Sequence, residues 1–313
     1  MRVLITGASG LLGINLALDL ARSHEVVGVD RSTLTAAPFR VVQADLLLPD
    51  AIGEVVNEVQ PDAVIHCAAL ADIDMCESKP ELAHRTNAIM AKQIAEVCAR
   101  RGLRLIHIST DAVYSGQKEG SYSESDIPDP RGVYAITKLE GERLVADAYA
   151  GATIARVNFY GWSISGRRSL AEFFVNHLSR GTNVNGFTDV TFCPMFVGHL
   201  SAVLKQMLPR DMHGIYHVVG LQAMTKYQFG VEIARKFGLQ ERLIAPQLVD
   251  TSQLKVRRAH NLWLSTNKIS TELQLELPDF STGLAAFHAQ YQLGYPQKIR
   301  SYQQLARTGF SGT

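Results

Sequence analysis

The sequence predicts an α/β fold, a Rossmann-type doubly wound parallel sheet with a smaller C-terminal substrate-binding lobe. Short apolar runs alternate with helical patterns, the first run is followed at once by a glycine-rich turn, and small or polar residues end the other runs. Strands that are apolar on both faces and separated by helices are typical of a parallel sheet covered by helices on each side. In such a sheet, ligands bind at the carboxyl ends of the strands.

The length, composition and charge of the chain limit the class of protein. The 313 residues, 46% of them hydrophobic, are enough for one large domain or two interleaved ones. The net charge of +1 comes with scattered Lys and Arg and no basic stripe, which disfavours nucleic-acid binding. No apolar run approaches the ~18 residues of a membrane span. The chain enters its first strand without a charged leader, so we expect a cytoplasmic protein.

The cysteines point to a reduced protein without a metal site. Cys67, Cys76, Cys98 and Cys193 form no Cys-x-x-Cys pair, and we expect them to be structural thiols. His66 lies next to Cys67, but no set of His, Cys and carboxylate residues has the spacing of metal ligands.

The first predicted strand, 3–6, leads into a turn with glycines three residues apart, at Gly7, Gly10 and Gly13, and then into a helical pattern. Such glycines let the backbone turn tightly and approach a pyrophosphate, and they present amide N–H groups and the positive end of the helix to it. The sequence therefore predicts a dinucleotide site at this turn.

The second predicted strand, 25–30, ends in Asp30. A carboxylate at this position can accept hydrogen bonds from the adenosine ribose hydroxyls and would repel a 2′-phosphate. Arg31 could instead hold that phosphate. We therefore expect NAD(H), with NADP(H) as the alternative.

The third predicted strand covers 39–46, with Asp45 near its end. Asp45 could reach the adenine amine, or it could cap a helix before Pro49. The fourth strand, 63–69, ends in small alanines that would let the backbone pass under a cofactor.

A long helix is predicted over 81–101, with Asn87 on its inner side. The fifth strand follows at 103–110 and ends in Ser109 and Thr110.

Tyr134 and Lys138 lie four residues apart in a helical pattern, so both side chains share one face. Together with Thr110 they supply a phenol, an ammonium and a hydroxyl, the groups needed to move a proton at a sugar or alcohol oxygen beside a nicotinamide. Tyr114 and Lys118 have the same spacing, but the intervening Gly116 disfavours a helix that would place them on one face.

The second half of the chain is less regular. A strand is predicted over 153–160, and another at 215–219. Helices are predicted near 169–180, 197–208 and 225–238. We expect a NAD(P)-binding domain over 1–160 and a smaller lobe over 161–313 that returns segments to the first sheet and shares its core.

With these residues, the chain resembles an extended short-chain dehydrogenase/reductase, and within that class the dTDP-4-dehydrorhamnose reductase family. The glycine turn, Tyr134 and Lys138 carry the wider resemblance. The more specific matches are the run Ala-Ala-Leu-Ala-Asp-Ile-Asp at 68–74 with Glu77, the run Ser-Thr-Asp-Ala-Val-Tyr at 109–114 with Gly116, and Arg-Arg-Ala-His-Asn at 257–261. The resemblance implies reduction of a 4-keto-6-deoxyhexose attached to a nucleoside diphosphate.

The resemblance also implies roles for individual residues. Thr110 would bind the keto oxygen, Tyr134 would donate the proton, and Lys138 would bring the pKa of Tyr134 toward the working range. The implied substrate contacts are Thr110, Asp111, Phe159 and Arg258. The predicted cofactor contacts are Gly7, Ser9, Gly10, Leu11, Leu12, Gly13, Asp30, Arg31, Asp45, Leu46, Ala68, Ala69, Leu70, Asn87, Ser109, Tyr134, Lys138 and Asn158.

The chain departs from this family at two places. It has Asn158-Phe159-Tyr160 where the family has Ser-Trp-Val-Tyr, and Pro194-Met195 where the family has Pro-Thr. Both positions face the substrate in the family, so the identity of the sugar stays open.

Three other functions compete with this prediction. A nucleotide-sugar epimerase uses the same three groups, whereas a 4,6-dehydratase would carry Glu at the position of Ala112. A non-catalytic, cofactor-binding regulatory subunit, as in the related beta subunit of methionine adenosyltransferase, belongs to another class. The sequence leaves the oligomeric state open, with a homodimer as one option.

Overall fold

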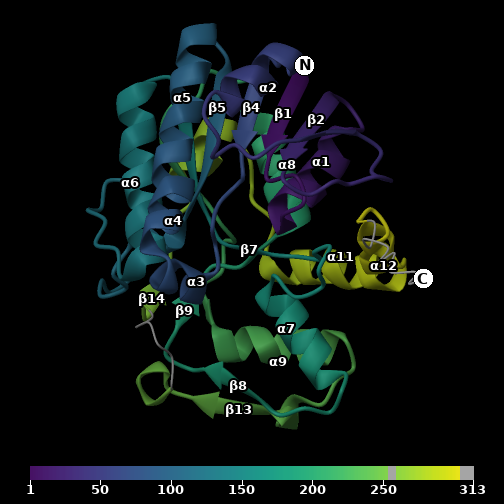
Figure 1. Cartoon of the computed structure of the whole chain (residues 1–313). Coiled ribbons are helices and arrows are strands. Elements are labelled where there is room, and N and C mark those ends of the chain that lie inside the picture. Colours follow the sequence, from purple (N-terminus) through teal and green to yellow (C-terminus); the bar gives the residue numbers. More distant parts are fainter. Residues whose placement is uncertain (253–258, 304–313) are drawn as a thin grey trace, which may run out of the picture.

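The computed structural model describes residues 1–252 and 259–303 and confirms the predicted α/β fold (Figure 1). Its main sheet has seven parallel strands in the order β11-β6-β5-β4-β1-β2-β3. The bounds are β1 Arg2–Thr6, β2 Glu25–Asp30, β3 Arg40–Gln43, β4 Ala63–His66, β5 Arg104–Thr110, β6 Thr153–Val157 and β11 Gly214–Val218.

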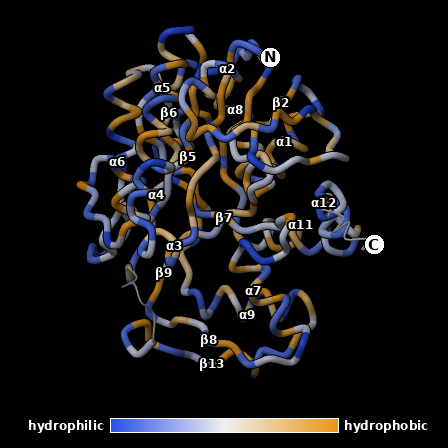
Figure 2. Tube along the Cα trace, in the orientation of Figure 1, coloured by the Kyte–Doolittle hydropathy of each residue, from blue (hydrophilic) through white to orange (hydrophobic). Residues whose placement is uncertain are grey.

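Helices cover both faces of this sheet because side chains alternate along each buried strand. Helices α1 (Leu11–Leu20) and α8 (Val197–Met207) lie on one face, in an apolar cluster with Val3 and Ile5. On the other face, α2 (Ala51–Val59), α5 (Met90–Arg101) and α6 (Gly132–Ala148) cover Leu4 and its neighbours. Figure 2 shows hydrophobic residues concentrated in these central strands.

The order of the strands fixes where a ligand can bind. From β1 the chain passes to β2 and β3 on one side, and then crosses to β4 on the other side of β1. Ligands of open α/β sheets bind in the crevice at such a switch point, beyond the carboxyl ends of the strands. Here that crevice lies between the turn after β1 and the loop after β4.

Several predicted elements are shorter or more divided than expected. Strand β3 ends at Gln43 and β4 at His66, three residues earlier than predicted in each case. The predicted helix 81–101 is divided into α4 (Pro80–His84), a π-helical turn (Arg85–Ile89) and α5. The π-helical turn packs on α6 at Gly141, where a Cβ would overlap the carbonyl of Asn87, so the two helices approach very closely.

The predicted strand 153–160 is also divided. It leaves the main sheet after Val157, and β7 (Phe159–Tyr160) pairs instead with β10 (Met195–Phe196). The side chain of Asn158, between the two strands, is bonded to Asp111. The short helix α3 (Ile73–Ser78) was not predicted; Asp72 caps it by accepting a hydrogen bond from the Met75 N–H.

The second lobe lies below the main sheet in Figure 1. Its helices α7 (Leu170–Leu178) and α9 (Lys226–Lys236) confirm two predictions, and both begin at capping boxes, Ser169 with Glu172 and Thr225 with Gln228. Its small sheets pair β8 (Val184–Phe187) with β13 (Ile244–Gln247), and β9 (Thr191–Phe192) with β12 (Met224–Thr225) and β14 (Asn261–Leu262). Helices α10 (Asn267–Leu273), α11 (Phe280–Gln292) and α12 (Tyr295–Arg300) follow.

Two segments from beyond residue 160 belong to the main sheet and to the helices that cover it. The predicted strand near 215–219 is β11, at the edge of the main sheet, and the predicted helix near 197–208 is α8, which packs on α1. A domain boundary near residue 160 stays a proposal. Among the described residues, no helix is long and apolar enough to cross a membrane.

Candidate active site

The turn after β1 has the shape of a pyrophosphate cradle. Gly7 has φ +68°, and a Cβ there would stand 2.8 Å from the Cα of Ala68. A Cβ on Gly13 would overlap the Gly7 carbonyl. Gly10 is the N-cap residue of α1 and makes no side-chain hydrogen bond, so the cap itself leaves the first N–H groups of the helix uncovered. The buried side chains of Leu11 and Leu12 leave only their backbone to this cradle, which fits the pyrophosphate of a dinucleotide.

Asp30 stands beside this turn. One of its oxygens, Oδ2, accepts hydrogen bonds from the backbone N–H of Ser9 at 2.9 Å and from its hydroxyl at 2.8 Å. The other, Oδ1, accepts one from Ser32 N–H at 3.1 Å. The carboxylate is thereby fixed next to the cradle, and Arg31 beside it is exposed.

Asp45 has a local role in the structure. Its carboxylate accepts a hydrogen bond from the Leu47 N–H at 3.0 Å and stabilises a turn, whereas α2 begins later, after Asp50. The prediction that Asp45 caps this helix is therefore wrong, and contact with adenine stays a prediction. Leu46 is buried in the core against α2.

Asn87 supports the loop that follows β4. Its side-chain oxygen accepts the Leu70 N–H at 2.8 Å, and its nitrogen donates to the Leu70 carbonyl and the Thr137 hydroxyl, each at 3.1 Å. Asn87 is buried, as the pattern predicted, but it lies behind the loop 68–70. We expect it to act on the cofactor site through Leu70, in place of the direct contact expected from the sequence.

Ser109 is turned away from the crevice, contrary to its prediction as a cofactor contact. Its hydroxyl donates to Glu142 on α6, and that carboxylate also binds the guanidinium of Arg156 on β6 at 2.6 Å. All three side chains are buried. They connect the strand that ends in Thr110 to the helix that carries Tyr134.

Thr110, Asp111, Tyr134 and Asn158 meet around a cavity of about 210 Å³. Thr110 accepts a hydrogen bond from the Ala112 N–H at 3.2 Å and donates one to Asp111 at 3.1 Å. The amide of Asn158 donates to the other oxygen of Asp111 at 2.6 Å. Asn158, expected at the cofactor, therefore lies in the wall of the substrate-sized cavity.

Burial controls the proton affinities of this cavity. It raises the pKa of Asp111 to about 6, against the hydrogen bonds from Asn158 and Thr110, which lower it. It also raises the pKa of Tyr134 to about 12, although a hydrogen bond with Thr110 lowers it. Tyr134 is therefore a neutral phenol at pH 7.

Lys138 is buried on the same helix as Tyr134, and its role in bringing the pKa of Tyr134 toward the working range stays a prediction. Its ammonium donates to the Ile108 carbonyl at 2.7 Å. Burial lowers the pKa of Lys138 to about 8. The prediction that Tyr114 and Lys118 share no helical face is confirmed, since Tyr114 is extended and Gly116 has φ +76°.

The two remaining predicted substrate contacts, Phe159 and Arg258, are not among the residues that line the cavity within the described part of the chain. Phe159 is half-buried in β7, and Arg258 lies outside the described residues. Arg131 and Lys226 also line the cavity and were missed. Lys226 is the first residue of α9, directly after the N-cap Thr225. The capping box marks the start of the helix in the sequence, but it does not show that Lys226 faces the cavity.

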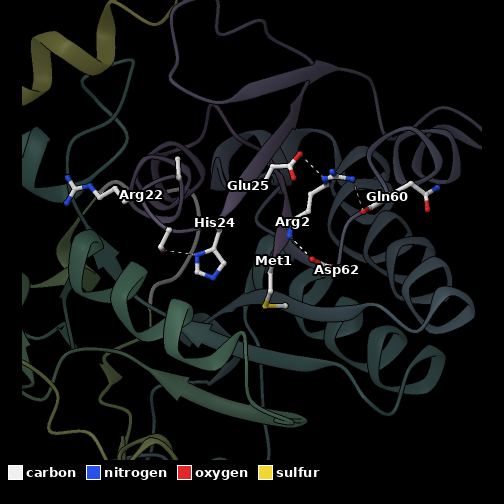
Figure 3. A pocket seen from close by; sticks show the side chains of 9 residues that line it. Met1, Arg2, Arg22, His24, Glu25, Gln60 and Asp62 are labelled. Carbon is white, nitrogen blue, oxygen red and sulfur yellow. Dashed lines mark hydrogen bonds and ion pairs between the residues drawn. The ribbon is translucent and has the colours of Figure 1, made fainter.

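A larger hollow, of about 690 Å³, lies at the opposite end of the sheet (Figure 3). There the Arg2 side chain pairs with Glu25 at 2.8 Å, and the Arg2 backbone N–H donates to Asp62 at 2.6 Å. Because these residues stand at the amino ends of the strands, the hollow is not at the switch point where dinucleotides bind.

Comparison with known proteins gives the family. Residues 1–293 match the model of the RmlD substrate binding domain. The chain is 32% identical over 295 residues to a probable low-salt glycan biosynthesis reductase, Agl14, of Haloferax volcanii, covering 93% of this chain and 98% of that one. It is 30% identical over 293 residues to methionine adenosyltransferase 2 subunit beta of Mus musculus, covering 90% and 86%.

The fold is also that of solved enzymes. The crystal structure of dTDP-4-dehydrorhamnose reductase from Bacillus anthracis in complex with NADP matches with a TM-score of 0.84 and 24% identity, covering 92% of this chain and 99% of that one. Another structure of this fold was determined with NAD bound. By the family match and by its fold, the chain belongs to the RmlD substrate binding domain family, among the NAD(P)-dependent oxidoreductases of the extended short-chain dehydrogenase/reductase type.

Proposed function

We propose that this protein reduces a 4-keto-6-deoxy sugar carried on a nucleoside diphosphate, with Tyr134 as the proton donor. The observation that carries the proposal is the hydrogen bond of the Tyr134 phenol with the Thr110 hydroxyl at a cavity that lies, like the glycine turn, at the carboxyl ends of the strands. Family membership supports the substrate class.

The residues of the chain divide the chemistry between them. A bound nicotinamide supplies the hydride. When substrate binds, the single O–H of Thr110 would turn from Asp111 to the carbonyl oxygen and polarise it, and Tyr134, neutral at pH 7, would donate its proton to that oxygen. The buried ammonium of Lys138 stands on the same helix and supplies the positive charge that the phenolate needs once its proton has left.

The proposal is tested by mixing the purified protein with NADH or NADPH and a panel of nucleoside-diphosphate 4-keto sugars, and following nicotinamide absorbance. Consumption of reduced cofactor in step with sugar supports a reductase. An epimerase would leave the absorbance unchanged over many turnovers while the sugar is converted.

We propose NAD(H) as the favoured cofactor because the Asp30 carboxylate stands at the end of β2 beside the cradle. Replacing Asp30 with Ser should raise the KM for NADH by about tenfold or more, because hydrogen bonds to a charged group are lost. It should also lower the KM for NADPH, because the carboxylate that repels a 2′-phosphate is gone. Initial rates with both cofactors measure the change.

Arg31→Ala is the matched control for this preference. If Asp30 sets the choice, the Arg31 variant keeps the wild-type preference for NADH. A preference for NADPH in the wild-type protein that Arg31→Ala abolishes would show that Arg31, exposed beside Asp30, selects the cofactor instead.

A non-catalytic role is the second candidate, favoured by the 30% identity to methionine adenosyltransferase 2 subunit beta over most of both chains. In that case the protein would bind a nicotinamide cofactor and form a tight stoichiometric complex with a methionine adenosyltransferase catalytic chain. Absence of turnover on every keto sugar, together with that complex, would favour this role over the reductase.

A further inference from the structure

A cluster of buried polar side chains lies under Lys138, on the face of the main sheet that α6 covers. Thr6, His66 and His107 stand at one level of three neighbouring strands, since Thr6 pairs with His66 and His66 with His107. Their exposed fractions are 2%, 1% and 0%. The mechanism above uses none of the three.

Lys138 is bonded to this cluster. Its Nζ lies 2.7 Å from the Ile108 carbonyl oxygen and 3.4 Å from Nε2 of His107, and its side chain is 2% exposed. An ammonium has only donors, so Nε2 of His107 accepts and its ring is neutral, with the proton on Nδ1. Nδ1 is buried and has no hydrogen-bond partner among the described residues.

The second imidazole keeps the first in place. The rings of His66 and His107 have centroids 5.2 Å apart and planes 31° from parallel. Nδ1 of His66 lies 2.7 Å from the hydroxyl of Thr6, which also accepts the N–H of Ala68 at 3.1 Å.

One positive charge resides in this cluster, and it belongs to Lys138. Burial and the charge of Lys138 lower the pKa of His66 to about 3 and that of His107 well below its usual value. The other ionisable groups that affect Lys138 are Glu142, one turn along α6, and Cys67, after β4; both raise its pKa against the effect of burial. Neither imidazole therefore competes with Lys138 for its proton at neutral pH.

We propose that His107 is a positioning residue that holds the ammonium of Lys138 in a fixed direction. The Ile108 carbonyl and the His107 ring take two of its three N–H groups, both on the side of β5. The third is left for groups bound in the crevice. His107 acts as a neutral acceptor and transfers no proton, so an uncharged acceptor of similar reach can replace it.

The direct test measures the titration of Lys138 in the ligand-free protein by NMR of its side chain. His107→Phe removes the acceptor, and the midpoint should fall by about one pH unit, the equivalent of one lost hydrogen bond. His107→Gln, whose amide oxygen can accept, should restore the wild-type midpoint. His66→Phe keeps a ring against His107 without touching Lys138 and should leave the midpoint near wild type.

Three outcomes would overturn the proposal. They are an unchanged midpoint in His107→Phe, an equal fall in His66→Phe, or a failure of His107→Gln to restore the value. If His107→Phe does not fold, the pair of His107→Gln and His107→Leu measures the same contrast.

The kinetic arm rests on the proposed function. The alkaline limit of kcat should move to lower pH in His107→Phe by the same shift as the NMR midpoint, and return in His107→Gln. If the NMR shift is present and no keto sugar is turned over, the reductase proposal fails while the role of His107 stands. If turnover is present without the NMR shift, the role of His107 fails alone.

Discussion

Replacing Tyr134 with Phe should lower kcat for keto-sugar reduction by about 10²- to 10⁴-fold, because the variant has no proton to give to the reduced carbonyl oxygen. The phenol is neutral at pH 7, since burial raises its pKa to about 12, so the wild-type enzyme carries its donor in the active form. The measurement is single-turnover oxidation of NADH with a 4-keto sugar nucleotide, and a fluorescence titration of NADH binding reports whether the cofactor site is intact.

The matched control is Tyr149→Phe, at the end of α6 far along the helix from Tyr134. It removes a phenolic hydroxyl from the C-cap residue directly after α6 and should keep the wild-type rate. A Tyr134→Phe variant that retains near-full turnover with unaltered NADH binding would show that another group, such as the buried Asp111 with its pKa of about 6, protonates the oxygen.

The elements that could be predicted from the sequence are those fixed by local pattern. Apolar runs and glycine spacing located β1, β2 and the turn between β1 and α1, and the strand pattern placed Asp30 at the end of β2, where the structure shows it bonded to Ser9. Helical spacing put Tyr134 and Lys138 on one helix. Each of these depends on neighbours within a few positions in the chain or on the rule for parallel sheets.

What could not be predicted depends on contacts between distant segments. Ser109 and Thr110 are adjacent and both polar, yet alternation along β5 sends one to Glu142 and the other to the cavity. The contact between the Lys138 ammonium and His107 was missed for the same reason. His107 lies within the apolar sequence of β5, and nothing in that sequence shows that its ring faces α6.

The buried pair of Glu142 and Arg156 should hold the site elements together, and Glu142→Gln should destabilise the protein by about 3–5 kcal/mol. Arg156 is among the largest fully buried side chains, and its guanidinium makes a fork of bonds to the Glu142 carboxylate, at 3.0 Å from Nε and 2.6 Å from the second nitrogen. The neutral amide of the Glu142→Gln variant leaves the buried guanidinium of Arg156 without a countercharge. Urea unfolding at pH 7 measures the loss.

Two comparisons make this prediction specific. Glu140→Gln, on the same helix but half-exposed beside His84, should change the free energy of unfolding by about 0–1 kcal/mol. Glu142→Leu combined with Arg156→Met removes both charges and should recover most of the stability, because the cost lies in the unpaired charge and not in the missing bond. The recovered double variant should still be slow, since the carboxylate that Ser109 and Arg156 share is also what fixes α6, with Tyr134, against the strand that ends in Thr110. If the double variant is as unstable as Glu142→Gln, the pair contributes attraction beyond compensating a buried charge.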